Sequence, residues 1–155
     1  MTAGDVAGMV SVLFAGLLAG EEFVMRCGIR GPLASLDDRS HILVRQALIR
    51  SLRVLVPSIY ALALLSAVAG TALDGVDAGL ALRGAGILAL VIWIAVTLAG
   101  TVPINAAALE WDVSDPPVTW RTQVDRWERL NTVRTWAAVV AFALLLVGFN
   151  VTAIG

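Results

Sequence analysis

The chain has 155 residues, of which 59% are hydrophobic and 15% are charged, and its mean hydropathy is +0.86. Soluble domains contain about 45–50% apolar and about 25% charged residues, so this composition predicts a membrane protein. A net charge of -1 excludes a nucleic-acid partner, which would call for a strongly basic surface. The single cysteine, Cys27, excludes an internal disulfide framework and a cysteine-based zinc site.

Four largely uncharged runs are long enough to cross a lipid bilayer, which takes roughly 20 apolar residues. Glu21 and Glu22 interrupt the first run, and it lacks the basic start of a cleaved signal peptide, so we interpret it as a retained helix. Pro103 and Asn105 indicate that the membrane part of the third run ends near Ile104. The sequence therefore predicts an all-α, four-helix transmembrane bundle that forms one domain over residues 1–155, with spans at about 6–25, 54–73, 84–104 and 135–154.

The arginines predict how these helices are oriented. The chain has 11 basic residues, all of them arginine, and all except Arg83 lie in residues 26–53 or 121–134. Basic residues close to the ends of spans remain on the cytoplasmic side of a membrane. We therefore expect both arginine-rich segments in the cytoplasm, and both termini outside, in a multi-pass protein of the plasma membrane.

The second and fourth helices are expected to extend beyond the bilayer into the cytoplasm. Ser40 is a candidate N-cap for the second helix, well before its span begins. Pro57 lies inside that helix and should kink it, because proline lacks the N–H that an earlier carbonyl needs. Pro116 and Pro117 are expected to open the fourth helix, since proline suits the first helical turn.

Small residues on the first helix predict close helix packing. Gly16 and Gly20 are four residues apart, and Ala15 and Ala19 widen the same small face. Such spacing allows two helix backbones to approach closely within a membrane. We expect this face to pack inside the bundle, and assembly into a homo-oligomer is the alternative.

Two glutamates near the inner end of the first span are candidates for chemistry. Glu22 is four residues before Arg26, a spacing that predicts an ordinary ion pair on the helix surface. Glu21 has no such neighbour. It is expected either to reach the interface or an arginine of another helix, or to be buried as a general acid or base.

His41 is the only histidine in the chain. Its place near a helix start, four residues before Arg45, favours a surface role. In a cavity it would be the one side chain available as a base or metal ligand near neutral pH. Haem bound through His41 is one cofactor hypothesis, which an absorption spectrum of the purified protein tests, and chemistry without a cofactor is the other.

An aromatic and polar stripe runs along the fourth helix. The spacing of Trp120, Trp127, Asn131 and Arg134 places all four side chains on one helical face. Tryptophans at this depth commonly anchor helices at the membrane interface. The same four side chains are also suited to line a pocket for a planar, oxygenated ligand. The sequence leaves both interpretations open.

Several segments together resemble a known family. They are Gly100-Thr-Val-Pro-Ile-Asn105, Trp111-Asp112, Pro116-Pro117, and Arg126-Trp127-Glu128-Arg129-Leu130-Asn131 with Arg134. This pattern resembles the DUF1772 family of small four-span membrane proteins, which includes anthrone oxygenases. The resemblance implies an oxidoreductase that converts an activated methylene of a polycyclic phenolic substrate to a ketone with dioxygen, without a bound cofactor.

The resemblance also suggests roles for particular residues. Either Glu21 or His41 would act as the base, the donors to a developing oxyanion would be Asn105, Asn131 and Arg134, and the aromatic walls would be Trp120 and Trp127. The alternative is a non-enzymatic membrane module that binds a lipid, a quinone, haem or a partner protein. A transporter is a further alternative, although one chain of this length lacks inverted repeats.

Overall fold

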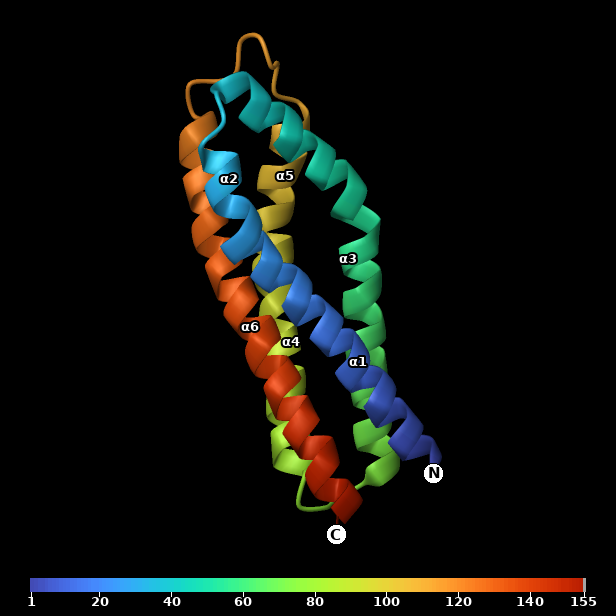
Figure 1. The fold of residues 1–155 in the computed structure, drawn as a ribbon. Coiled ribbons are helices and arrows are strands. Elements are labelled where there is room, and N and C mark those ends of the chain that lie inside the picture. Colours follow the sequence, from blue (N-terminus) through green and yellow to red (C-terminus); the bar gives the residue numbers. More distant parts are fainter. Residues whose placement is uncertain (155) are drawn as a thin grey trace.

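The computed structural model describes the backbone of residues 1–154 and the side chains of residues 1–151. Within these residues every regular element is helical, which confirms the predicted all-α fold. Four long helical segments run alternately up and down the bundle (Figure 1). They comprise α1 (Ala3–Val24) continued by η1 (Met25–Ile29) and α2 (Arg30–Ala34); α3 (Asp38–Asp74); α4 (Leu80–Val96) continued by η2 (Thr97–Thr101) and α5 (Val102–Leu109); and α6 (Trp120–Ile154).

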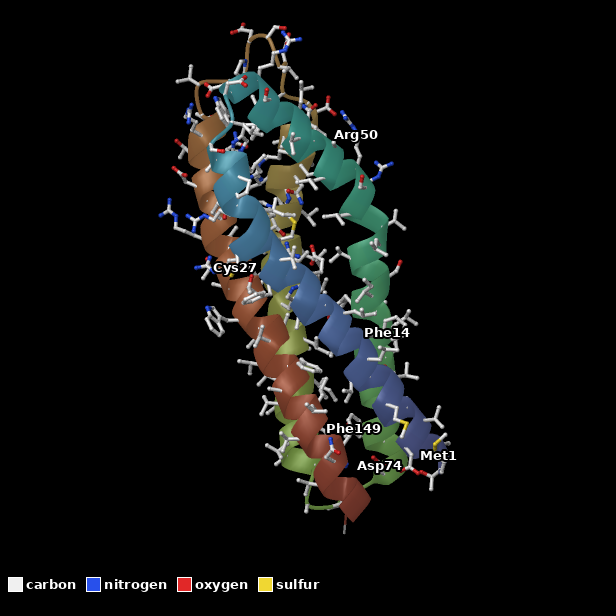
Figure 2. The ribbon with its side chains drawn as sticks, viewed as in Figure 1. Met1, Phe14, Cys27, Arg50, Asp74 and Phe149 are labelled. Carbon is white, nitrogen blue, oxygen red and sulfur yellow. The ribbon has the colours of Figure 1, made fainter. Side chains whose placement is uncertain are left out.

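All four segments are long and apolar enough to cross a membrane, so the chain is a membrane protein by length and composition. The two ends of the chain lie at one end of the bundle, where Figure 2 labels Met1, Asp74 and Phe149. The connections from α2 to α3 and from α5 to α6 lie at the opposite end, towards which Arg50 is found. The two arginine-rich segments therefore share one end of the fold.

Two predicted helix starts are wrong by a few residues. The side chain of Asp37, not Ser40, caps α3, because its Oδ1 accepts the backbone N–H of Ser40 at 3.1 Å. The hydrogen bonds from Ser40 hold the pKa of Asp37 below its usual value. Helix α6 begins at Trp120 rather than at the two prolines, and the carbonyl of Pro117 accepts the Trp120 N–H at 2.9 Å. The prolines shape the preceding loop instead.

Pro57 lies inside α3, which remains helical through it. The proline cannot donate to the carbonyl of Arg53, and this lost bond weakens the helix there. In Figure 1 the two parts of α3 point in different directions, and the part nearer the arginine-rich end runs back over that end of the bundle. There Gln46 of α3 donates to the carbonyls of Ala108 and Trp111 at 3.0 and 3.1 Å, so beyond the bend α3 packs against the end of α5.

The small residues of α1 pack inside the bundle only in part. Ala15 and Ala19 are buried in the main core. A Cβ added at Gly16 would lie 3.2 Å from the ring of Phe142 on α6, whereas one added at Gly20 would have no neighbour within 4 Å. Alanine, rather than the predicted glycine pair, therefore provides most of this interface.

The turn between α3 and α4 is fixed by a buried arginine at the end of the bundle that carries the termini. Arg83 has no exposed surface and donates to both carboxylate oxygens of Asp77 at 2.9 Å. It also donates to Asp74 at 3.4 Å and to the Gly75 carbonyl at 3.3 Å. This ion cluster accounts for the one arginine that lies outside the two basic segments.

Two glycines of α4 differ in how closely the neighbouring helix approaches them. A Cβ at Gly86 would lie 2.8 Å from Leu145 of α6 and 3.3 Å from the Ala141 carbonyl, but one at Gly84 would meet nothing within 4 Å. We expect Gly86→Ala to lower the free energy of unfolding in detergent micelles by about 1–3 kcal/mol through overpacking. The control Gly84→Ala should be neutral or stabilise by up to about 1 kcal/mol through helix propensity. Equal effects would contradict this packing.

Candidate functional site

A cavity of about 340 Å³ lies in the arginine-rich half of the bundle, and all four helical segments contribute to its lining. The wall formed by α6 carries a polar group on every lining side chain: Trp127, Glu128, Asn131 and Arg134. The wall formed by α3 is mainly apolar and carries two arginines, Arg45 and Arg53, among the apolar residues Leu48, Ile49, Leu52, Val56 and Pro57. The cavity is therefore polar on one side and apolar on the other.

A buried ion pair lies at this cavity. Glu22 is 1% exposed and pairs with the guanidinium of Arg134, which reaches it from α6. The indole N–H of Trp93 donates to the same carboxylate oxygen at 2.9 Å. Arg134 also donates to the hydroxyl of Thr101 at 3.3 Å. Three helical segments thus meet at one charge pair, which fixes where the guanidinium lies.

The guanidinium of Arg134 also makes a cation–π contact with an aromatic pair. The central carbon of the Arg134 guanidinium lies 4.6 Å from the ring centre of Trp93. The ring of Tyr60 stacks on that indole with a centroid distance of 4.9 Å and an angle of 18°. Cation–π contact is stronger for buried side chains than for exposed ones, and Arg134 and Trp93 are 7% and 1% exposed. Arg134 is thereby placed as a fixed cation beside the cavity.

The two π-helical turns lie on either side of this site. Met25 and Ile29 of η1 line the cavity, and so do Thr97 and Thr101 of η2. A π-turn adds one residue to a helix, and such turns are frequent at functional sites because they redirect side chains. Both π-helical turns found in residues 1–154 therefore contribute to the larger cavity.

Several lining side chains have a buried polar atom without a partner among the described residues. The acceptors are Oε2 of Glu21 and Oδ1 of Asn105, and the donors are Nε1 of Trp127, Nδ2 of Asn131 and Nε of both Arg45 and Arg134. Buried polar groups nearly always have a hydrogen-bond partner in folded proteins, so a cluster of exceptions needs an explanation. A bound polar molecule or water would satisfy them.

His41 and Trp120 lie together beside a second pocket of about 160 Å³. Their ring centroids are 5.4 Å apart in an edge-on arrangement. Glu128 lines both this pocket and the larger cavity, and it pairs with Arg30 at 3.2 Å and with Arg45 at 3.7 Å. Within the described part of the chain, no group of three or more His, Cys, Asp or Glu side chains is arranged to hold a metal ion.

A family model, that of anthrone oxygenase, matches residues 46–144, which is more than half of the chain. This chain belongs to the anthrone oxygenase family. Comparison with curated proteins and with solved structures gives no match. The segment that matches the anthrone oxygenase model carries the candidates Asn105, Trp120, Trp127, Asn131 and Arg134, together with Trp93. The two glutamates and His41 precede it.

The structure brings together some, but not all, of the site residues predicted from the sequence. Glu21, Asn105, Trp127, Asn131 and Arg134 line one cavity in this member of the anthrone oxygenase family. The candidates His41 and Trp120 line the second pocket instead, although Trp120 shares the helix α6 with the others.

For the most deeply buried carboxylate, Glu22, the sequence predicted the wrong partner and a surface position. Glu22 was expected to pair with Arg26, but it pairs with Arg134, and Arg26 donates to the hydroxyl of Thr132. The signal for this lay in the spacing of Ser11, Ala15 and Glu22, which form one stripe of buried positions on α1. The contributions of Trp93, Arg45 and Glu128 carried no comparable signal in the sequence.

Proposed function

We propose that this protein is a membrane oxygenase that converts an activated methylene of a planar, hydrophobic phenolic molecule to a ketone. The observation that carries the proposal is the half-polar cavity beside a fixed Arg134 in a chain of the anthrone oxygenase family. Its apolar side suits fused rings, and its unpartnered donors suit the oxygen atoms at one edge of such a ring system.

The proposed reaction balances without a further reductant. A base removes one proton from the methylene carbon, and the resulting enolate gives its electrons to dioxygen as a C–O bond forms. The resulting peroxide anion takes the first proton back from the base and becomes a hydroperoxide. The base then removes the second methylene proton while the O–O bond breaks, and the departing hydroxide takes up that proton, which leaves a C=O group and one water molecule. One dioxygen is consumed for each ketone. The chain's task is to hold the ring, take the proton and stabilise the enolate oxygen.

Glu21 is the base that this proposal selects. Its carboxylate lines the cavity, whereas Glu22 is not among the lining residues and one of its carboxylate oxygens is bound by both Arg134 and Trp93. A general base must come within hydrogen-bond reach of the proton that it removes, which favours Glu21 over His41 in the second pocket. Arg134 and the amides of Asn131 and Asn105 would bind the oxygens, and Trp127 would stack against the rings.

The same proposal includes the location of the protein. The arginine-rich segments share one end of the bundle and the two termini share the other. The positive-inside rule then supports both termini outside and the cavity near the cytoplasmic side of the plasma membrane. A reporter fused to either terminus should be active only on the outer face, and activity inside the cell would reverse this topology.

Proteoliposomes supplied with anthrone and dioxygen test the activity directly. We expect anthraquinone to form much faster than in protein-free liposomes, which correct for oxidation by air, and we expect one dioxygen to be consumed per ketone. Oxygen-18 gas should label the new carbonyl and the released water equally, because each receives one atom. A rate equal to that of the protein-free liposomes would contradict the proposal. Binding of anthraquinone without turnover would instead favour a non-enzymatic binding module.

A further inference from the structure

The opening of the large cavity lies between two particular helices. Most of its lining residues are buried or half-buried, and the exposed ones besides Arg30 are Arg53 and Pro57 of α3 and Val102 and Ala106 of α5. We call these last four residues the lateral opening. It includes Pro57, the proline inside α3, a helix whose two parts point in different directions (Figure 1). The interior is thus reached from the side of the bundle.

The surface around the lateral opening is apolar. Val54 is 68% exposed on α3, and Leu98, on the segment that continues into α5, is 61% exposed. Exposed apolar side chains on helices of spanning length face lipid acyl chains. Arg53 is the one charged residue of the opening, and it directly precedes the predicted second span, where a long arginine side chain can reach lipid headgroups. The opening therefore faces lipid, close to the arginine-rich end.

The two walls of the cavity would orient an amphipathic molecule that enters from lipid. The mainly apolar wall belongs to α3, which borders the opening, and the polar wall belongs to α6. An amphipathic ring system that slides in from the acyl chains can keep its apolar edge against α3. Its oxygenated edge then reaches the unpartnered donors of Trp127 and Asn131.

We infer that the cavity takes its planar, amphipathic ligand directly from the membrane, through the lateral opening between α3 and α5. The identity of that ligand as a fused-ring phenol rests on the proposed function. The route rests on the exposed opening, the bend of α3 and the two unlike walls. The ligand is therefore a molecule that partitions into lipid before it binds.

Cysteine labelling in proteoliposomes tests this route without relying on turnover. The native Cys27 is exposed, so Cys27→Ser removes it, and Ala106→Cys then places a thiol at the opening. Leu98→Cys is the matched control, because it is exposed on the same helical segment but outside the cavity lining. Each thiol is treated with lipid-soluble N-pyrenylmaleimide or with a charged methanethiosulfonate, with and without anthraquinone. Val102→Cys replaces Ala106→Cys if the latter does not fold.

We expect both thiols to prefer the lipid-soluble reagent. Anthraquinone at ten times its dissociation constant should slow labelling at position 106 roughly tenfold and leave position 98 unchanged. Faster reaction of the position-106 thiol with the charged reagent would overturn the inference, and so would labelling there that anthraquinone does not slow.

Turnover of anthrone separates this inference from the proposed function. Protection by anthraquinone together with an absence of wild-type turnover would refute the oxygenase and leave the route supported. Conversely, Ala106→Trp should obstruct the opening and lower kcat/KM, with the Leu98→Trp control unaffected. Unchanged kcat/KM in Ala106→Trp would overturn the route and leave the oxygenase standing.

Discussion

Replacement of Arg134 by methionine is expected to lower the free energy of unfolding by about 3–5 kcal/mol, because it leaves a buried carboxylate without its partner charge. Glu22 is 1% exposed, and after the substitution its carboxylate would keep only the indole N–H of Trp93 as a side-chain donor. Titration with a denaturing detergent in mixed micelles, followed by circular dichroism, measures the change. Arg126→Met removes an exposed arginine of the same helix and should alter stability by less than about 0.5 kcal/mol.

The double variant shows whether the loss comes from the pair itself. Glu22→Gln alone should also destabilise, because it leaves a buried guanidinium unpaired. Glu22→Gln combined with Arg134→Met should be more stable than the sum of the two losses predicts, since neither charge remains. Strictly additive losses would contradict a direct interaction between the two side chains. The double variant should also fail to oxidise anthrone, because the proposed cation is gone.

Replacement of Glu21 by glutamine is expected to lower kcat for anthrone about 10²–10⁴-fold, the range for removal of a general base. Glutamine has the shape of glutamate and can still fill this part of the cavity wall, but it cannot accept the methylene proton. We expect little change in KM or in stability, because the side chain is only half-buried and has an oxygen without a partner. Steady-state rates of anthraquinone formation measure both constants.

Two further variants decide whether the loss is specific to Glu21. Glu110→Gln removes an exposed carboxylate outside the cavity lining and should retain full activity. His41→Ala should lower turnover less than Glu21→Gln does, since His41 lines the second pocket. If Glu21→Gln turned over anthrone like the wild type while His41→Ala were inactive, the base would be His41 and its pocket would be the reactive one.

The sequence predicted the large-scale arrangement well, because lipid imposes strong demands on sequence. Long apolar segments and the clustering of arginine were enough to predict four helices and two basic segments at one end. Helix starts were less accurate, since both Asp37 and Ser40 carry side chains that can cap a helix. Such local competition is settled by backbone geometry, which residue type alone does not specify.

The candidate site was predicted less well, because in a membrane the large apolar residues do not mark the inside of a bundle. On α1, Leu13 and Leu17 are 58% and 48% exposed, although both are large and apolar. The stripe of small residues on α1 faces the core instead and leads to Glu22. Small side chains mark helix interfaces where lipid and leucine are equally apolar.

The prediction that the four residues of the α6 stripe share one helical face was correct, but they do not all line one pocket. Asn131, Arg134 and Trp127 reach one cavity, whereas Trp120 lies beyond Glu128 and packs near His41. Glu128 lies between the two pockets, and it forms ion pairs with Arg30 and Arg45, which come from two other segments. Pairings of residues so far apart in the chain cannot be read from the spacing on one helix.

The π-turn in the third helical segment changes which residues share a face. Trp93 and Asn105 both line the cavity, although in an uninterrupted α-helix at about 100° per residue their side chains would point roughly 120° apart. The residue that η2 adds reduces this difference to about 20°. An uninterrupted α-helix that kept all the residues of η2 would therefore rotate Asn105 away from the cavity by about 100°, although the amino-acid sequence would be unchanged. The angular phase of the helix, as much as its composition, determines the inner surface of this protein.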